Sequence, residues 1–170
     1  MQFLIFALVY PFIWLLSKLP MRFLYIISDL LYIFVYHVFK YRKTVVFNNL
    51  NLVFPEKSSE EKKQIAKKFF RHFTDLFMET IKAISISKKE ILKRYQYKNP
   101  EVAQKFIKEG RSIAFVSAHQ ANWEWFANAP LLVNCRARGA YTSLGNKYFD
   151  KVVRDSRERF GFVCYESSKT

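Results

Sequence analysis

The stretch that decides the fold is Ser112-Ile113-Ala114-Phe115-Val116, followed closely by His119-Gln120-Ala121-Asn122-Trp123-Glu124. The first part is a short apolar run typical of a buried strand, and the second holds a histidine and a carboxylate five positions apart. On one continuous helix that separation would rotate the two side chains roughly 140° apart. They can meet if His119 lies in the turn after the strand and Glu124 in the first turn of the next helix. We therefore predict a strand over 112–116, a bend, and a helix over 123–133 that Asn122 caps.

Strand and helix patterns alternate from here toward the end of the chain. The pattern predicts a strand over 138–142, a helix over 147–160 and a third strand over 162–165. Strands that alternate with helices indicate an α/β fold with a parallel, helix-covered sheet. In such sheets the functional site lies beyond the carboxyl ends of the strands, and His119 falls at such a position.

Composition narrows the class of partner. The 170 residues carry a formal net charge of +14 although 51% of them are hydrophobic. Basicity together with high apolar content favours a protein that works on anionic lipid at a membrane. Nucleic-acid binding is disfavoured because the aromatic residues fall on apolar faces and do not interleave with basic residues. The two cysteines, Cys135 and Cys164, show no pairing or metal-ligand spacing, which suits a reducing compartment.

The amino-terminal region is predicted to anchor the chain to a membrane. Two apolar runs, 3–16 and 23–39, are each followed by basic residues, which places the remainder on the cytoplasmic side. The first run is short for a bilayer crossing, which needs about 20 residues. We expect membrane-anchor helices over 1–43, as one span or as two helices partly embedded in the inner leaflet, and the first part of a cytoplasmic domain over 44–170. A buried helical hairpin of a soluble protein is the alternative.

Further helices are predicted between these regions. Ser58 and Glu61 form a capping box that starts a helix, and apolar residues recur at helical spacing from Ile65 to Ile84. The other side of this helix is basic, which indicates either a solvated face or contact with phosphates or an acidic carrier protein. Shorter helices are expected over 88–94 and 101–109.

The His119–Glu124 pair indicates acid–base chemistry. A carboxylate that holds one ring nitrogen raises the basicity of the imidazole and leaves the other nitrogen free to take a proton from a hydroxyl. A structural hydrogen bond between the two residues is the alternative. The sequence lacks a metal-ligand cluster, a G-x-S-x-G elbow and a glycine-rich phosphate loop, so any anion has to be bound by lysine and arginine.

Several matching positions occur in order along nearly the whole chain. They are an apolar amino terminus, Asn49-Leu50 with Phe54-Pro55, Asp75 to Glu79, His119 to Glu124, Tyr141, Asn146, and Arg157-Glu158-Arg159-Phe160-Gly161. With these residues the chain resembles the bacterial lipid A biosynthesis acyltransferases of the lauroyl/myristoyl type. The Asn-Leu…Phe-Pro pairing and the H-x4-E box are the most specific parts of the resemblance.

The resemblance implies an inner-membrane enzyme that faces the cytoplasm. Such an enzyme transfers a fatty acyl chain from acyl carrier protein to a hydroxyl of a phosphorylated glycolipid, the lipid A precursor, without a cofactor, a metal or a covalent enzyme intermediate. It implies that His119 is the general base and that Glu124 orients and stabilises it. It also makes Arg157 and Arg159 candidates for contacts with phosphate or with the developing oxyanion. Asn146 and Arg154 join them as substrate-binding candidates, with solvation on a helix surface as the alternative for Arg154.

Two features depart from the family pattern. Thr142 follows Tyr141 where many members carry an arginine, and the chain ends at Thr170 where members continue for a stretch more than half as long again. We therefore expect an incomplete sheet and acyl-chain pocket. Acylation of another membrane lipid, a non-catalytic protein that binds anionic membranes, and an inactive fragment are the alternative functions.

Overall fold

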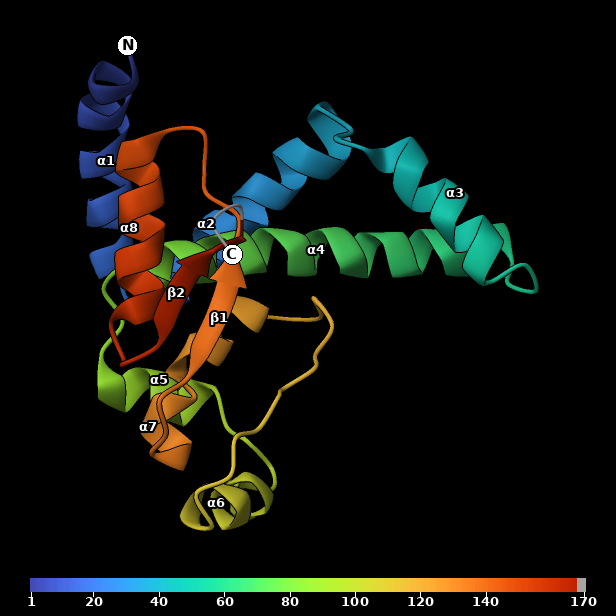
Figure 1. Ribbon diagram of the computed structural model, residues 1–170. Helices are drawn as coiled ribbons and strands as arrows, with labels where there is room; N and C mark the ends of the chain where they lie inside the picture. Colours follow the sequence, from blue (N-terminus) through green and yellow to red (C-terminus); the bar gives the residue numbers. More distant parts are fainter. Residues whose placement is uncertain (168–170) are drawn as a thin grey trace. The chain divides into compact units, whose positions relative to one another are not determined.

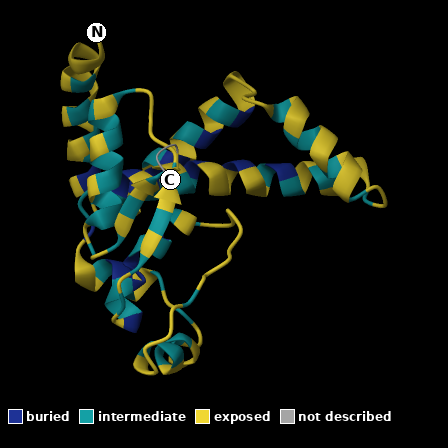
Figure 2. Ribbon diagram, viewed as in Figure 1, coloured by how far each residue is buried: buried dark blue, intermediate teal, exposed yellow. Residues whose placement is uncertain are grey.

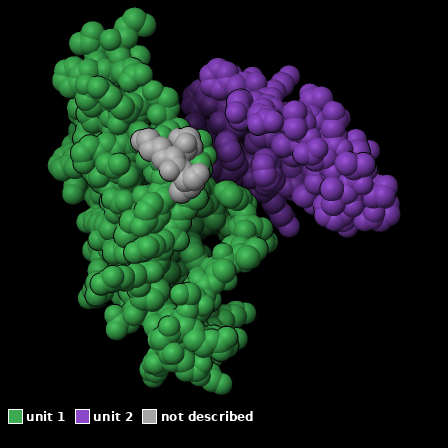
Figure 3. All heavy atoms as spheres, viewed as in Figure 1, with its two compact units in different colours: residues 1–18, 81–170 green, residues 19–80 purple. Residues whose placement is uncertain are grey.

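The computed structural model describes residues 1–167 and shows a mostly helical chain with one small sheet (Figure 1). It divides into two compact units (Figure 3). The sheet unit comprises Met1–Lys18 and Ile81–Thr170, and the helical unit comprises Leu19–Thr80. The predicted boundary at residue 43 falls within the helical unit, and the two-domain assignment stays a prediction.

Aromatic side chains form the core of the helical unit. Its elements are α2 (Met21–Tyr32), the π-helix η1 (Ile33–Val38), α3 (Lys43–Val53) and most of α4 (Ser59–Ala83). Tyr32, Tyr36 and Phe70 are buried together, with ring centroids 5.5 Å apart for the two tyrosines and 5.3 Å apart for Tyr36 and Phe70. The ammonium group of Lys43 lies 4.0 Å from the centre of the Tyr36 ring. This core joins η1 to α4 within the unit.

The predicted capping box at the start of α4 is confirmed. The Ser58 amide donates to Glu61 Oε2 at 2.9 Å, and the Glu61 amide donates to Ser58 Oγ at 3.3 Å. These bonds satisfy backbone donors that have no partner within the helix. The predicted short helices are also present, as α5 (Lys88–Arg94) and α6 (Pro100–Lys108).

One described helical stretch, Met21–Val38, is both long and apolar enough to cross a membrane. Helix α1 (Gln2–Lys18), with 17 residues, falls short of that length. Core helices of soluble proteins and signal sequences share the length and composition of Met21–Val38, so membrane anchoring stays a prediction.

A β-α-β arrangement organises the sheet unit. Strand β1 (Arg138–Tyr141) pairs in parallel with β2 (Val163–Glu166), and Gly139 lies opposite Cys164. Helix α8 (Lys147–Glu158) connects the two strands, as a parallel pair requires. The parallel sheet and its connecting helix, which the alternating pattern predicted, are confirmed.

The strand predicted over 112–116 is not formed. Residues 112–117 make no backbone–backbone hydrogen bond within the part of the chain that the structure describes. Phe115 is 49% exposed and Val116 is 96% exposed, although a buried strand was expected. A strand requires a neighbour for its N–H and C=O groups, and β1 pairs only with β2 in this two-stranded sheet. An apolar run by itself does not supply that neighbour.

The helix predicted over 123–133 is divided into two short elements. They are the 3₁₀-helix η2 (Trp123–Asn128) and α7 (Pro130–Val133). Pro130 lacks an amide hydrogen, so it cannot continue the hydrogen-bond ladder from η2, but it fits the first position of a new helix. Trp125, Ala129 and Val133 are buried on this segment (Figure 2). Together with Ile86 and Ile91 they belong to the buried apolar residues of the sheet unit.

Candidate functional site

His119 lies in a sharp bend between the extended segment and η2. The Gln120 amide donates to the Ala118 carbonyl at 2.8 Å, and Ala121 has a left-handed backbone with φ of 51°. Left-handed backbone is uncommon for a residue with a Cβ and is found at turns and functional sites. The predicted cap is confirmed, because Asn122 Oδ1 accepts a hydrogen bond from the Trp125 amide at 3.2 Å. The bend therefore places His119 before η2 and Glu124 in its first turn.

Glu124 forms a bidentate ion pair with Arg157 of α8. Arg157 Nε donates to Oε2 at 2.8 Å, and Arg157 Nη2 donates to Oε1 at 2.6 Å. Both side chains are mostly buried, with 18% of Glu124 and 16% of Arg157 exposed. Burial lowers the pKa of Arg157, but the hydrogen bonds and charge of Glu124 raise it by more, so the net shift of this pKa is upward. Such fork-to-fork pairs are strong and directional.

The indole of Trp123 contacts one residue predicted to be catalytic, His119, and one predicted to bind substrate, Arg157. The His119 ring lies 4.5 Å from the Trp123 ring, measured between centroids, and the Arg157 guanidinium lies 5.5 Å from the Trp123 ring centre. No hydrogen bond joins His119 to Glu124 within residues 1–167. The structure thus gathers His119, Trp123, Glu124 and Arg157, while the catalytic role of the dyad stays a prediction.

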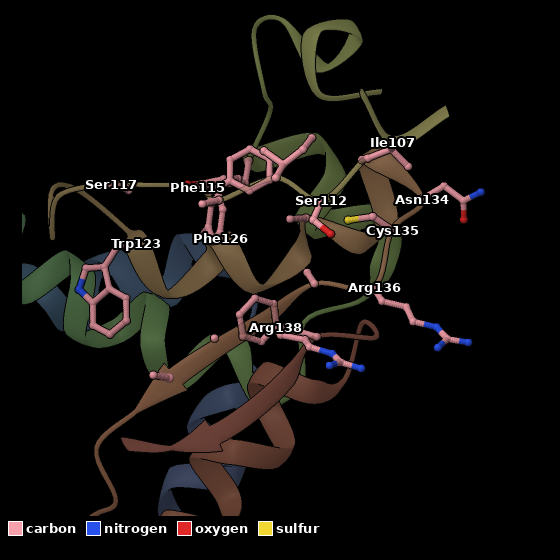
Figure 4. Close-up of a pocket in the computed structure, with 18 of the residues that line it drawn as sticks. Ile107, Ser112, Phe115, Ser117, Trp123, Phe126, Asn134, Cys135, Arg136 and Arg138 are labelled. Atoms are coloured by element: carbon pink, nitrogen blue, oxygen red, sulfur yellow. The ribbon is translucent and has the colours of Figure 1, made fainter. Parts of the chain in front are cut away.

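A cavity of about 940 Å³ opens beside His119. Residues of the extended segment 111–120 line it together with Phe126 and Arg138 (Figure 4). Phe162 also lines the cavity. Phe115 meets Phe126 edge to face with ring centroids 5.7 Å apart. The cavity therefore combines an apolar wall with basic residues, which suits an anionic amphiphile.

Sequence reasoning missed several residues of this cavity. Cys135, Arg136, Arg138 and Phe162 line it. The arginines are both exposed and stand two positions apart where β1 begins, so the alternation of a strand places them on one face. That alternation was the available signal for a basic wall.

Of the other predicted substrate-binding residues, Asn146 and Arg159 form hydrogen bonds within the protein, and Arg154 has a buried side-chain nitrogen. Asn146 caps α8, because its Oδ1 accepts from the Tyr148 amide at 3.0 Å. Arg159 Nη1 donates to the Ile84 carbonyl at 2.9 Å. Arg154 Nε is buried and has no hydrogen-bond partner among the described residues. Substrate contacts by Asn146, Arg154, Arg157 and Arg159 stay predictions.

Titratable groups near β1 and β2 include both cysteines. Burial raises the pKa of Cys135 and of Cys164, and the charge of Glu158 raises that of Cys164 further. A raised pKa disfavours the thiolate, so both thiols are weak nucleophiles at neutral pH. Within the described residues, no group of three His, Cys, Asp or Glu side chains is placed to hold a metal ion.

Neither a curated protein nor a solved structure matches this chain. The model of one family, described as bacterial lipid A biosynthesis acyltransferase, matches residues 1–169, which is nearly the whole chain. The chain therefore belongs to the bacterial lipid A biosynthesis acyltransferase family.

Proposed function

We propose that this acyltransferase-family chain moves a fatty acyl group from acyl carrier protein to a hydroxyl of a lipid A precursor, with His119 as the general base. The reaction would take place at the cytoplasmic face of the bacterial inner membrane. The observation that carries this proposal is the position of His119 in the wall of the cavity, five positions before a carboxylate that Arg157 holds.

The proposed transfer is a direct displacement. A ring nitrogen of His119 takes the proton of the acceptor hydroxyl as its oxygen attacks the thioester carbonyl carbon. The carbon–sulfur bond then breaks, and the thiol of the carrier leaves with the proton that His119 returns. No bond to the enzyme forms in this sequence, and the imidazole of His119 carries the proton from the acceptor hydroxyl to the leaving thiol.

Glu124 is proposed to stabilise the imidazolium that forms during the attack. Each of its oxygens accepts one hydrogen bond from Arg157, and each has a further lone pair that could accept from His119. Arg157 is then the residue that orients Glu124. This role replaces direct contact with phosphate as the first assignment for Arg157.

The charge of the cavity supports an anionic acceptor. Arg111, Arg136 and Arg138 line it, and the chain as a whole carries a net charge of +14. Both acyl carrier protein and a phosphorylated glycolipid are anionic, so one charge balance would attract both substrates. Asn146, Arg154 and Arg159 remain the further proposed contacts for the acceptor.

The test compares two histidine substitutions. His119→Ala should lower acyl transfer from acyl carrier protein at least about 100-fold, because a general base typically contributes that much. His72→Ala, at an exposed position on α4, is the matched control and should leave transfer unchanged. Circular dichroism and vesicle binding should be the same for both variants.

Two outcomes would contradict the proposal. A folded His119→Ala protein with undiminished transfer would remove the general base. Absence of transfer by the unmodified membrane-bound chain, with vesicle binding that survives replacement of both His119 and Glu124, would instead support a non-catalytic membrane-binding protein.

A further inference from the structure

Helix α1 is apolar on every face, but its two sides have different surroundings. Its one charged residue is Lys18, in the last turn. One side packs against α8, whereas the other carries Leu4, Leu8, Phe12 and Leu15, at helical spacing. Leu4 and Leu8 are each 70% exposed, and Phe12 is 65% exposed. A helix that is hydrophobic all round requires a second apolar environment.

The first turns of α1 are fixed to the start of α8. Gln2 Nε2 donates to the Gly145 carbonyl at 3.0 Å, and Asn146 Nδ2 donates to the Gln2 carbonyl at 3.0 Å. The Phe6 ring lies 5.4 Å from Tyr148 and 5.2 Å from Phe149, measured between centroids. The amino-terminal ends of the two helices therefore lie together.

The last turn of α1 is fixed near the end of α8. The Ser17 carbonyl accepts hydrogen bonds from Lys82 Nζ at 3.1 Å and from the Ser85 hydroxyl. The neighbouring Ile84 carbonyl accepts from Arg159, the residue that follows α8. Helices α1 and α8 thus run side by side in the same direction over their shared length (Figure 1).

This attachment decides how α1 can meet a bilayer. Lys147, Lys151 and Asp155 are exposed and recur every four residues along α8. If α1 crossed the membrane while bound to α8, this charged row would enter the hydrocarbon, where charged side chains are costly. A helix of 17 residues is also about 25 Å long, which is shorter than a hydrocarbon core of about 30 Å.

We propose that α1 lies in the plane of the membrane interface, with Leu4, Leu8, Phe12 and Leu15 among the lipid acyl chains and α8 on the water side. Lys18, whose ammonium group lies 4.9 Å from the centre of the Trp14 ring, provides a cation and an aromatic ring of the kind enriched at this depth. The net charge of +14 specifies anionic lipid as the partner. This inference concerns attachment and does not require acyl transfer.

The orientation has a consequence for the site. Packed helices have axes about 8–10 Å apart, so α8 is one helix removed from the lipid. Arg157 is on α8 and binds Glu124. Glu124, the carboxylate of the proposed dyad, is therefore connected to α1 through one intervening helix, α8.

Depth measurements test the orientation directly. Cysteines placed singly at Leu4, Leu8, Phe12 and Leu15, in a Cys135→Ser and Cys164→Ala background, are spin-labelled and bound to vesicles of phosphatidylglycerol and phosphatidylethanolamine. Collision with oxygen and with a water-soluble nickel chelate should give the same depth for all four labels. Lys151→Cys, on the outer side of α8, is the control and should stay accessible to nickel.

A depth that passes through a maximum in the middle of α1 would show a transmembrane helix and overturn the proposal. Labels that are protected without vesicles, in a protein that light scattering shows to be dimeric, would assign the face to a second copy. Labels that remain in water on vesicle-bound protein would also overturn it.

Vesicle binding gives a second measurement that needs no label. Leu8→Asp should weaken the affinity for the same vesicles by about tenfold, because one buried leucine is lost from the lipid contact. Val102→Asp places the same charge at an exposed apolar residue of α6 and should leave the affinity unchanged. Equal effects of the two substitutions would contradict the assigned face. Acyl transfer enters neither measurement, so failure here and failure of the proposed catalysis are distinguishable.

Discussion

Arg157 binds both carboxylate oxygens of Glu124 across 33 positions of sequence, at 2.8 Å through Nε and at 2.6 Å through Nη2. The pair joins η2, which follows the His119 bend, to α8, which connects the two strands. It therefore ties Glu124 of the proposed dyad directly to the β-α-β framework. Its geometry makes specific demands on the side chain at position 157.

Replacing Arg157 should separate the effect of charge from the effect of geometry. Arg157→Lys keeps the charge but loses the second parallel hydrogen bond, so we expect acyl transfer to fall by about tenfold or more through kcat, with KM little changed. Arg157→Met leaves the mostly buried carboxylate without a cation and should lower the free energy of unfolding by about 3 kcal/mol. Steady-state kinetics and urea denaturation measure the two effects.

The matched control for this pair is Lys151→Met. Lys151 and Asp155 form an exposed ion pair on the same helix, with 66% and 52% of their side chains exposed. Its loss should change the free energy of unfolding by at most about 0.5 kcal/mol. Equal destabilisation by Arg157→Met and Lys151→Met would show that the buried pair has no special role.

Asn146 has two separable structural contacts. Its Oδ1 caps α8, and its Nδ2 donates to the Gln2 carbonyl at the start of α1. Asn146→Ala removes both and should cost about 1 kcal/mol in the free energy of unfolding. Asn146→Asp keeps an acceptor for the cap but lacks the donor, so stability should be nearly retained while amide exchange in the first turns of α1 accelerates. Urea denaturation and hydrogen-exchange mass spectrometry distinguish these outcomes, and unchanged exchange in Asn146→Asp would argue against the tie to α1.

Gly139 lies where β1 passes the Phe162 ring. A Cβ at this position would be 2.7 Å from Phe162 Cζ, which is closer than non-bonded carbon atoms approach. Gly139→Ala should therefore destabilise the sheet unit by about 1–3 kcal/mol, and Phe162→Leu should recover part of that loss in a double-mutant cycle. Gly145→Ala meets nothing within 4 Å and is the control. A cycle without coupling between positions 139 and 162 would contradict the predicted clash.

The cysteine thiols should react slowly at mildly alkaline pH. Because burial raises the pKa of Cys135 and of Cys164 in the folded chain, less thiolate is present at pH 8 than in the unfolded chain. The folded state retains these protons longer, so their contribution to stability is full below the ordinary thiol pKa and is lost as the pH rises through the folded values. Iodoacetamide labelling with and without urea measures the difference, and Cys135→Ser isolates Cys164. Equal rates in the two solvents would contradict the raised pKa.

Local signals in the sequence predicted the local parts of the fold. The capping box of Ser58 and Glu61 and the cap of Asn122 on Trp125 each depend on two residues three positions apart, and the structure contains both. The β-α-β pattern predicted over 138–165 is also present, because each of its three elements has its own local signal. The strand expected over 112–116 depends on a distant neighbour, which its own residues do not specify. The partner of Glu124 has the same character, because no spacing rule connects position 124 to Arg157.

The predicted membrane region 1–43 contains helices from both compact units. Helix α1 belongs to the sheet unit and α2 to the helical unit. Hydropathy reports how apolar a segment is and not which partner it packs against. The bonds of Gln2 and Ser17 to residues more than sixty positions away determine that choice.

The extended segment 111–120 has a consequence for local unfolding. Residues 112–117 have no ladder bonds in the described structure, whereas α8 is a continuous hydrogen-bonded helix. Segments with few backbone bonds open at low free energy, often far below that of global unfolding. His119, the proposed proton acceptor, thus follows a segment that opens easily, whereas Glu124 is bound to the stable helix α8. His119 can therefore adjust its position to an incoming substrate while Glu124 stays fixed.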